Sequence, residues 1–212
     1  NDQNEIATET DAVAAQRKCA SQDVLEEQLR ADPTLMIRMN EIEAFTKNAV
    51  LTKRLVNAKV VIPVIVNVLY KTAAENISDA RIQSQIDILN KDFTATNPDF
   101  SNTPAEFASV AANVGITFEL VQIIRKSTTK TSWGTRDAMK KTKQGGLNPT
   151  SPTTNLNLWV CTIGGGILGY AQFPGGSSAT DGVVIDSKYV GLAGTGSYPY
   201  NLGRTATHEV GH

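Results

Sequence analysis

The chain has 212 residues, of which 41% are hydrophobic, and its formal net charge is −1. This length allows one sizeable globular domain and a shorter additional segment. The near-neutral charge gives no reason to expect nucleic acid or an acidic membrane surface as a partner. The longest apolar run, residues 60–66, is interrupted by Pro63 and is far shorter than the roughly eighteen residues of a membrane span.

The N-terminal part of the chain is expected to be a small helical segment. Ser21 precedes the run 23–29 and is interpreted as a helix N-cap. Asp32-Pro33 is the expected start of a second helix, and residues 48–57 are expected to form a linker. The second helix carries Leu35, Met36, Met39, Ile42, Glu43 and Phe45, and all of these except Glu43 form a loose apolar stripe. So short a segment cannot bury a core alone, so we expect it to dock on the rest of the chain.

Strands and two helices are expected in the remainder. Ser78 is expected to cap a helix whose apolar residues Ile82, Ile86, Leu89 and Phe93 recur at helical spacing. Another helix is expected to begin near Asn201 or Gly203 and to run into the histidines at the end of the chain. Five strands are expected, at 60–70, 115–124, 155–162, 167–173 and 182–187. Together these elements predict a layered α/β domain.

The two histidines of the chain, His208 and His212, lie four residues apart with Glu209 between them. Chance produces this arrangement on the order of once in two thousand such chains. Residues i and i+4 share one face of a helix, so both imidazoles can reach one metal, and zinc accepts imidazole nitrogens. Glu209 then stands beside the metal, where it can act as a general base. The alternative is a surface helix with two unrelated histidines.

Catalytic zinc usually has three protein ligands, and the chain has no third histidine. Either a carboxylate elsewhere in the chain completes the site, or the third ligand follows residue 212. We expect the second arrangement.

Three stretches, 164–176, 180–186 and 201–212, occur in the order found in a known family. With them, residues 60–212 resemble the pappalysin branch of the metzincins. The resemblance implies a metzincin-like N-terminal subdomain with a twisted, mostly parallel five-stranded sheet. It places the helix 78–93 and the active-site helix on the same side of that sheet. The family's third histidine and Met-turn would lie beyond residue 212, as would the ligands of a possible Ca²⁺ ion.

The resemblance also implies a role for Leu168, Gly169, Tyr170 and Ala171, which match the edge strand that pairs with an extended substrate. An unpaired sheet edge beside a metal is a suitable template for a strand-like peptide. The alternative is an ordinary core strand that follows a glycine-rich loop.

Cys19, in Arg17-Lys18-Cys19-Ala20, is a further candidate zinc ligand, because a thiolate on the metal would keep an enzyme latent. The segment around Cys19 resembles the propeptides of bacterial pappalysin-like proteins. Residues 1–54 are therefore expected to be an inhibitory propeptide, with activation by cleavage at Lys53-Arg54. Two alternatives stay open, a disulfide with Cys161 and a free thiol without function.

The sequence thus predicts a secreted zinc endopeptidase that hydrolyses peptide bonds with zinc-activated water and Glu209 as general base. Residues 55–212 would form the N-terminal half of its catalytic domain. Its partners would be protein or peptide substrates, its own propeptide and the rest of the catalytic domain. The alternatives are a zinc peptidase of another clan with a downstream Glu ligand, and a non-catalytic secreted binding module on a peptidase fold.

Overall fold

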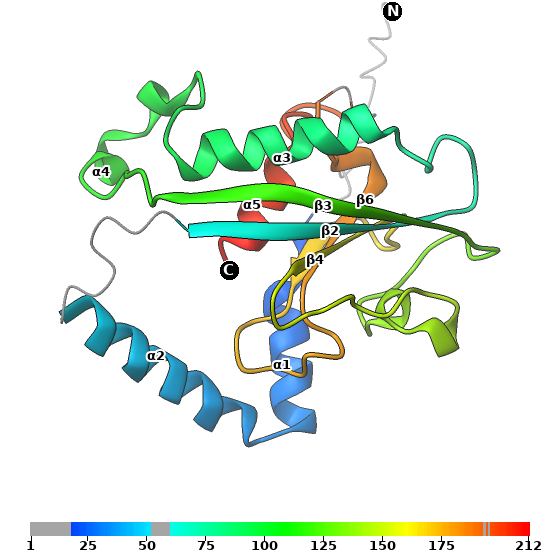
Figure 1. The fold of residues 1–212 in the computed structure, drawn as a ribbon, viewed down its shortest axis with the longest axis horizontal. Coiled ribbons are helices and arrows are strands. Elements are labelled where there is room, and N and C mark those ends of the chain that lie inside the picture. The colour runs from blue at the N-terminus through cyan, green and yellow to red at the C-terminus, as the bar shows by residue number, and fades with distance from the viewer. Residues whose placement is uncertain (1–17, 52–59, 193, 195) are drawn as a thin grey trace, which may run out of the picture.

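A mixed sheet with the strand order β1-β5-β6-β4-β2-β3 forms the centre of the fold. The computed structural model of the chain describes residues 18–51, 60–192, 194 and 196–212 (Figure 1). Every pair of neighbouring strands is parallel except β5 and β6, which are antiparallel. The strands are β1 (Lys18–Cys19), β2 (Val60–Tyr70), β3 (Ile116–Ser127), β4 (Leu156–Cys161), β5 (Ile167–Ala171) and β6 (Val183–Asp186).

β2 lies between β3 and β4, and its sequence explains both its burial and its tolerance of a proline. The residues from Val64 to Leu69 are all buried, as suits an apolar, β-branched central strand. Pro63 cannot donate a backbone hydrogen bond. It lies just before Val64, where the pairing of β2 with β4 begins, so the strand has only β3 as a neighbour at that position.

Two helices cover one face of the sheet. α3 (Asp79–Phe93) begins after Ser78, whose side chain accepts a hydrogen bond from the backbone N–H of Arg81, so the predicted cap is confirmed. α5 (Arg204–Val210) packs on the same side, since Ala206 shares one core cluster with residues of α3 and the sheet. The α3 members of that cluster are Ile82, Ile86 and Leu89.

A second core cluster covers the opposite face. There Trp159 and Tyr170 of the sheet pack against Trp133 and Met139 of the 128–155 connection and against Val24 of α1 (Ser21–Ala31). The part of the N-terminal segment that comprises β1 and α1 therefore docks on the sheet. Short helical turns complete the described structure, namely η1 (Phe100–Asn102), α4 (Ala105–Ala108), η2 (Ala138–Lys140), η3 (Thr142–Gln144) and η4 (Ser187–Tyr189).

The helix that follows α1 is longer than expected. α2 spans Leu35–Leu51, so the expected linker 48–57 was wrong in its first residues, and 52–59 lie outside the described residues. Figure 1 shows α2 standing away from the sheet. Arg38 Nε holds it by donating to the carbonyl of Gly175 at 2.7 Å, while Phe45 is 71% exposed.

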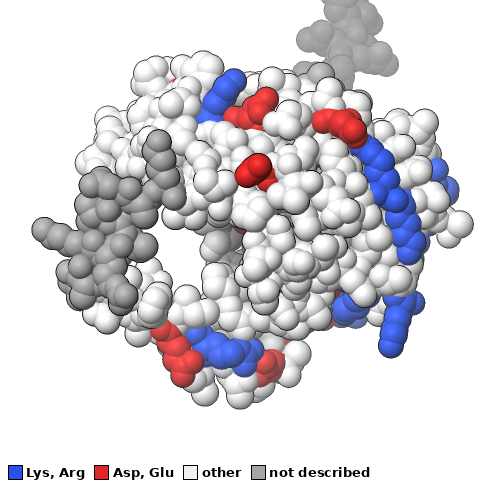
Figure 2. Space-filling model, in the orientation of Figure 1, with Lys and Arg blue, Asp and Glu red and all other residues white. Residues whose placement is uncertain are grey.

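The predicted fold class is confirmed, and the sheet has one more strand than expected. β2 to β6 are the five expected strands, and β1 adds a sixth from the N-terminal segment. On the face in Figure 2, basic side chains are most frequent along the right-hand edge, and acidic ones lie toward the top and bottom. Within the described part of the chain, no helix has the length and apolar character required to span a membrane.

Candidate metal centre

The start of α5 is fixed by α3. Gln85, which is fully buried on α3, donates from Nε2 to the carbonyl of Gly203 at 2.9 Å and accepts from the N–H of Gly191 at 2.8 Å. Gly203 precedes α5 with a φ of +71°, and a Cβ there would lie 2.5 Å from Cδ1 of Ile88. A glycine is therefore needed where the chain turns into the helix that carries the histidines.

Ion pairs hold the same helix from its side. Arg204 Nη1 and Nη2 bind the two carboxylate oxygens of Asp99 at 2.7 and 2.6 Å, and its Nε lies 3.1 Å from Asp92. Thr207 Oγ1 donates to Asp92 at 2.7 Å. The hydrogen bonds from Arg204 hold the pKa of Asp99 below its usual range. α5 is thus anchored to the loop after α3 and to α3 itself.

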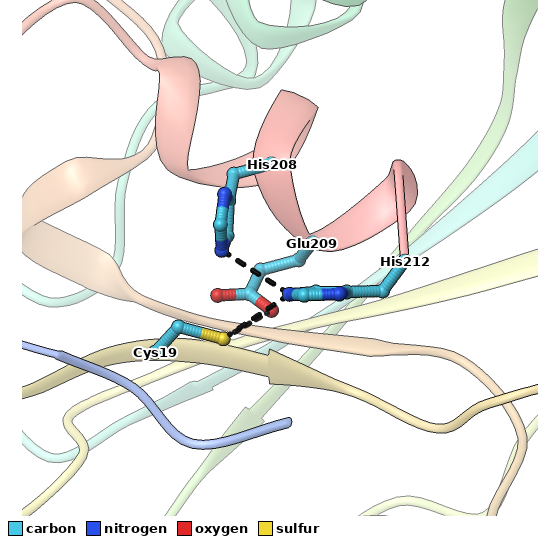
Figure 3. Close-up of side chains that lie close together, drawn as sticks. All are labelled: Cys19, His208, Glu209 and His212. Atoms are coloured by element: carbon cyan, nitrogen blue, oxygen red, sulfur yellow. Dashed lines mark hydrogen bonds between the residues drawn. The ribbon is translucent and has the colours of Figure 1, made fainter. Parts of the chain in front are cut away.

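Four side chains converge at the C-terminal end of α5, as Figure 3 shows. One possible ligand atom from each of Cys19, His208, Glu209 and His212 lies within 4.8 Å of the others. The Nε2 atoms of His208 and His212 are 3.2 Å apart, and Cys19 Sγ lies 3.4 Å from Nε2 of His212. The ring of Phe173 packs beside His212 at a centroid distance of 5.5 Å.

These distances fit the donors of one tetrahedral zinc site. Two imidazole nitrogens at about 2.0–2.1 Å from zinc stand about 3.3 Å apart, and a thiolate at about 2.3 Å stands about 3.6 Å from each of them. The observed separations of 3.2 and 3.4 Å agree with these values. The chemistry also fits, since neutral imidazole and thiolate are the ligands that zinc prefers.

Glu209 lies on the inner side of the helix and is 1% exposed. Its Oε2 accepts hydrogen bonds from Ser21 Oγ at 2.9 Å and from Cys19 Sγ at 3.3 Å. Its Oε1 has no hydrogen-bond partner among the residues that the structure describes. Burial raises the pKa of Glu209, and burial also raises the pKa of the Cys19 thiol. A buried carboxyl group with one unsatisfied oxygen is typical of a group placed to exchange a proton.

The expected edge strand lies directly below this carboxyl group. β5 pairs with β6 on one side and with the two-residue β1 on the other, and the N–H of Ala20 donates to the carbonyl of Gly169 at 3.1 Å. A Cβ at Gly169 would lie 2.8 Å from the carbonyl oxygen of Val184 and 3.1 Å from Oε1 of Glu209. The glycine therefore allows the close approach of α5 to the strand.

The remaining predicted residues have mixed outcomes. Both cysteines are free, and Cys161 is 0% exposed within the second core cluster, so the structure does not contain the disulfide that was one alternative. Lys53 and Arg54 lie outside the described residues.

Comparisons with known proteins give this site its context. No protein-family model matches the chain. It is 34% identical over 145 residues to an extracellular metalloprotease of Colletotrichum graminicola, a match covering 64% of this chain and 42% of the relative. A solved structure of Tannerella forsythia mature mirolysin in complex with a cleaved peptide matches with 44% identity and a TM-score of 0.71. That match covers 74% of this chain and 63% of the other.

A variant of Tannerella forsythia promirolysin matches with 39% identity and a TM-score of 0.80, over 92% of this chain and 68% of that one. The chain belongs to the pappalysin-type metzincins. The chain spans 42% of the length of the Colletotrichum graminicola relative and 64% of the length of an extracellular metalloprotease of Pyricularia oryzae.

The sequence of this pappalysin-type chain did not identify Ser21 as a residue of the site, and it indicated Gly169 only as part of the edge strand. The interpretation of Ser21 as a helix N-cap was wrong, because α1 begins at Ser21 itself and its hydroxyl binds Glu209 instead. Since Cys19 and Ser21 are two residues apart, an extended segment would place both on one face, and this spacing is the signal that could have found Ser21. The steric role of Gly169 depends on its distance from Glu209, which the sequence does not contain.

Proposed function

We propose that the chain is the proenzyme form of a secreted zinc endopeptidase, with residues 1–54 as propeptide and 55–212 as the N-terminal half of the catalytic domain. The observation that carries this proposal is the convergence of Cys19, His208 and His212 around donor distances suited to zinc, with Glu209 beside them. The extracellular metalloproteases among its relatives support secretion and metal-dependent hydrolysis.

In the activated enzyme, His208 and His212 would hold zinc together with a third ligand located beyond residue 212. When bound there, zinc supplies a Lewis acid that polarises the scissile carbonyl and acidifies the attacking water. Glu209 would accept a proton from that water and then pass it to the leaving amine. A calcium ion, which the resemblance allows, would take its ligands beyond residue 212.

The free side of β5 would bind the substrate. Once β1 leaves, Leu168 to Ala171 present unpaired backbone groups to an extended peptide, which suits strand addition. A cavity of about 300 Å³ adjoins the site, with Lys18 and Cys19 of β1 in its wall, so departure of β1 would open it to a side chain of that peptide. Its lining includes Leu168, Tyr200, Thr205 and His208.

Latency would result from β1 occupying this same place. Cys19 would take the zinc position needed for catalysis, and cleavage at Lys53-Arg54 would allow the propeptide to dissociate. The solved structures support this division, because the matched share of this chain rises from 74% with mature mirolysin to 92% with promirolysin.

The test of this proposal is a peptidase assay on the full-length protein after activation. We expect cleavage of unstructured protein substrates, its loss on treatment with a zinc chelator, and its return when zinc is added back. Zinc binding without any hydrolysis would support a non-catalytic binding module instead. Hydrolysis that survives complete removal of zinc would contradict the assignment of the metal.

Gly169→Ala is expected to reduce this activity by about 100-fold, because the added Cβ pushes Glu209 and β5 apart and small displacements in an active site have effects of this size. Overpacking should also destabilise the protein by about 1–3 kcal/mol, measurable by urea unfolding. Gly134→Ala is the matched control, since a Cβ there meets nothing within 4 Å. Equal activities of the two variants would show that Glu209 does not depend on the glycine.

A further inference from the structure

Ser21 makes contacts that are separate from the proposed binding of Cys19 to zinc. Its side chain is completely buried at the start of α1, and its Oγ lies 2.9 Å from Oε2 of Glu209. The backbone N–H of Ala171, at the end of β5, donates to the same Oγ at 2.8 Å. One hydroxyl group thus bridges the carboxyl group beside the metal site and the strand that borders it.

The chemistry of a hydroxyl group fits both contacts at once. A serine has one O–H donor and two acceptor lone pairs. Its proton can be donated only to the carboxylate, because the N–H of Ala171 is itself a donor. A remaining lone pair accepts from the N–H of Ala171, and the sulfur of Cys19 lies 3.3 Å from the same oxygen.

These contacts occupy groups that the activated enzyme would use. Oε2 of Glu209 accepts from Ser21 and is held against the N-terminal segment, and the N–H of Ala171, which donates to Ser21, cannot pair with a substrate. None of the bonds of Ser21 involves His208 or His212, so they would persist in the absence of metal. Because hydrogen bonds to charged, buried groups are among the stronger ones, the contact with Glu209 should stabilise the docked state by about tenfold or more.

We propose that Ser21 is a second latency residue, which inhibits the enzyme by binding Glu209 and the edge of β5 independently of zinc. The inference rests on the proposed function of Glu209, but the contact itself can be measured without any enzymatic activity. The propeptide would then block the site through two side chains, with Cys19 directed at the metal and Ser21 directed at the base.

Amide hydrogen exchange of residues 18–31 in the zinc-free, full-length protein tests the proposal. The N–H of Ala20, bonded to Gly169, reports whether the segment is docked. Ser21→Ala is expected to accelerate this exchange about tenfold. Thr46→Ala is the matched control, since it removes an exposed hydroxyl of the same segment that bonds only within α2. Exchange of β4 reports whether the fold as a whole is intact.

A double-mutant cycle shows whether the effect of Ser21 on docking comes from its bond to Glu209 or from its bond to Ala171. Glu209→Ala alone should also accelerate exchange of residues 18–31, which keeps the test available if Ser21→Ala does not fold. Adding Ser21→Ala to Glu209→Ala should then have an effect smaller than about threefold. Unchanged exchange in either single variant would overturn the proposal, as would a full tenfold effect of Ser21→Ala in the absence of Glu209. Failure of the peptidase assay with these exchange results intact would refute the proposed function alone.

Discussion

Glu209→Ala is expected to lower kcat/KM of the activated full-length enzyme by about 10²–10⁴-fold while its zinc content stays the same. The carboxyl group is buried beside the donor atoms, with Oε2 bonded to Ser21 and Oε1 without a partner among the described residues. Removing it eliminates the proton acceptor and leaves both imidazoles in place. Steady-state kinetics and metal analysis of the same preparation would check both halves of the prediction.

Glu119→Ala is a suitable control for this variant, because Glu119 is an exposed acidic residue on β3. It should have unchanged kinetics. Full activity of Glu209→Ala would show that another group accepts the proton. Loss of zinc together with activity would show that Glu209 acts as a ligand.

Cys19→Ala is expected to give a proenzyme whose activation rate is higher by at least about 10- to 100-fold. Loss of a residue that only supports a metal ligand already has an effect of roughly this size, and Cys19 would be a ligand itself. The sulfur lies 3.4 Å from Nε2 of His212 and 3.3 Å from Oε2 of Glu209, and the substitution removes both contacts. The time course of propeptide cleavage, followed by gel electrophoresis, measures the effect. Thiol-modifying mercurials should activate the unaltered proenzyme for the same reason.

The other cysteine provides the comparison. Cys161→Ala should lower stability, because the side chain is 0% exposed in the core, without changing the activation rate. Maturation of Cys19→Ala at the original rate would exclude Cys19 from latency. Latency would then depend on steric blocking of β5 by β1 and on Ser21.

The sequence predicted those parts of the fold that local patterns determine. The β-branched run of β2 and the helical spacing of Ile82, Ile86 and Leu89 indicate buried elements whatever surrounds them. Ser78 caps α3 because its bond to Arg81 is local. By the same local rule Ser21 was interpreted as a cap, and there a partner 188 positions away in the sequence determined the outcome.

The candidate site was predicted only as far as spacing could specify it. The i, i+4 separation of His208 and His212 is sufficient to bring two imidazoles together on one helix. The approach of Cys19 depends on how β1 pairs with β5, which two residues of strand cannot encode locally. The resemblance to a family supplied that expectation, and the same applies to the orientation of β5 against β6.

X-ray absorption at the zinc edge of the full-length proenzyme tests whether Cys19, His208 and His212 bind one zinc ion. We expect one zinc per chain, with imidazole nitrogens at about 2.0–2.1 Å and one sulfur at about 2.3 Å. The sulfur signal should disappear in Cys19→Ala while the nitrogen signal remains. A protein that binds no zinc, or a zinc that keeps its ligands when both His208 and His212 are replaced, would contradict a zinc site at these residues.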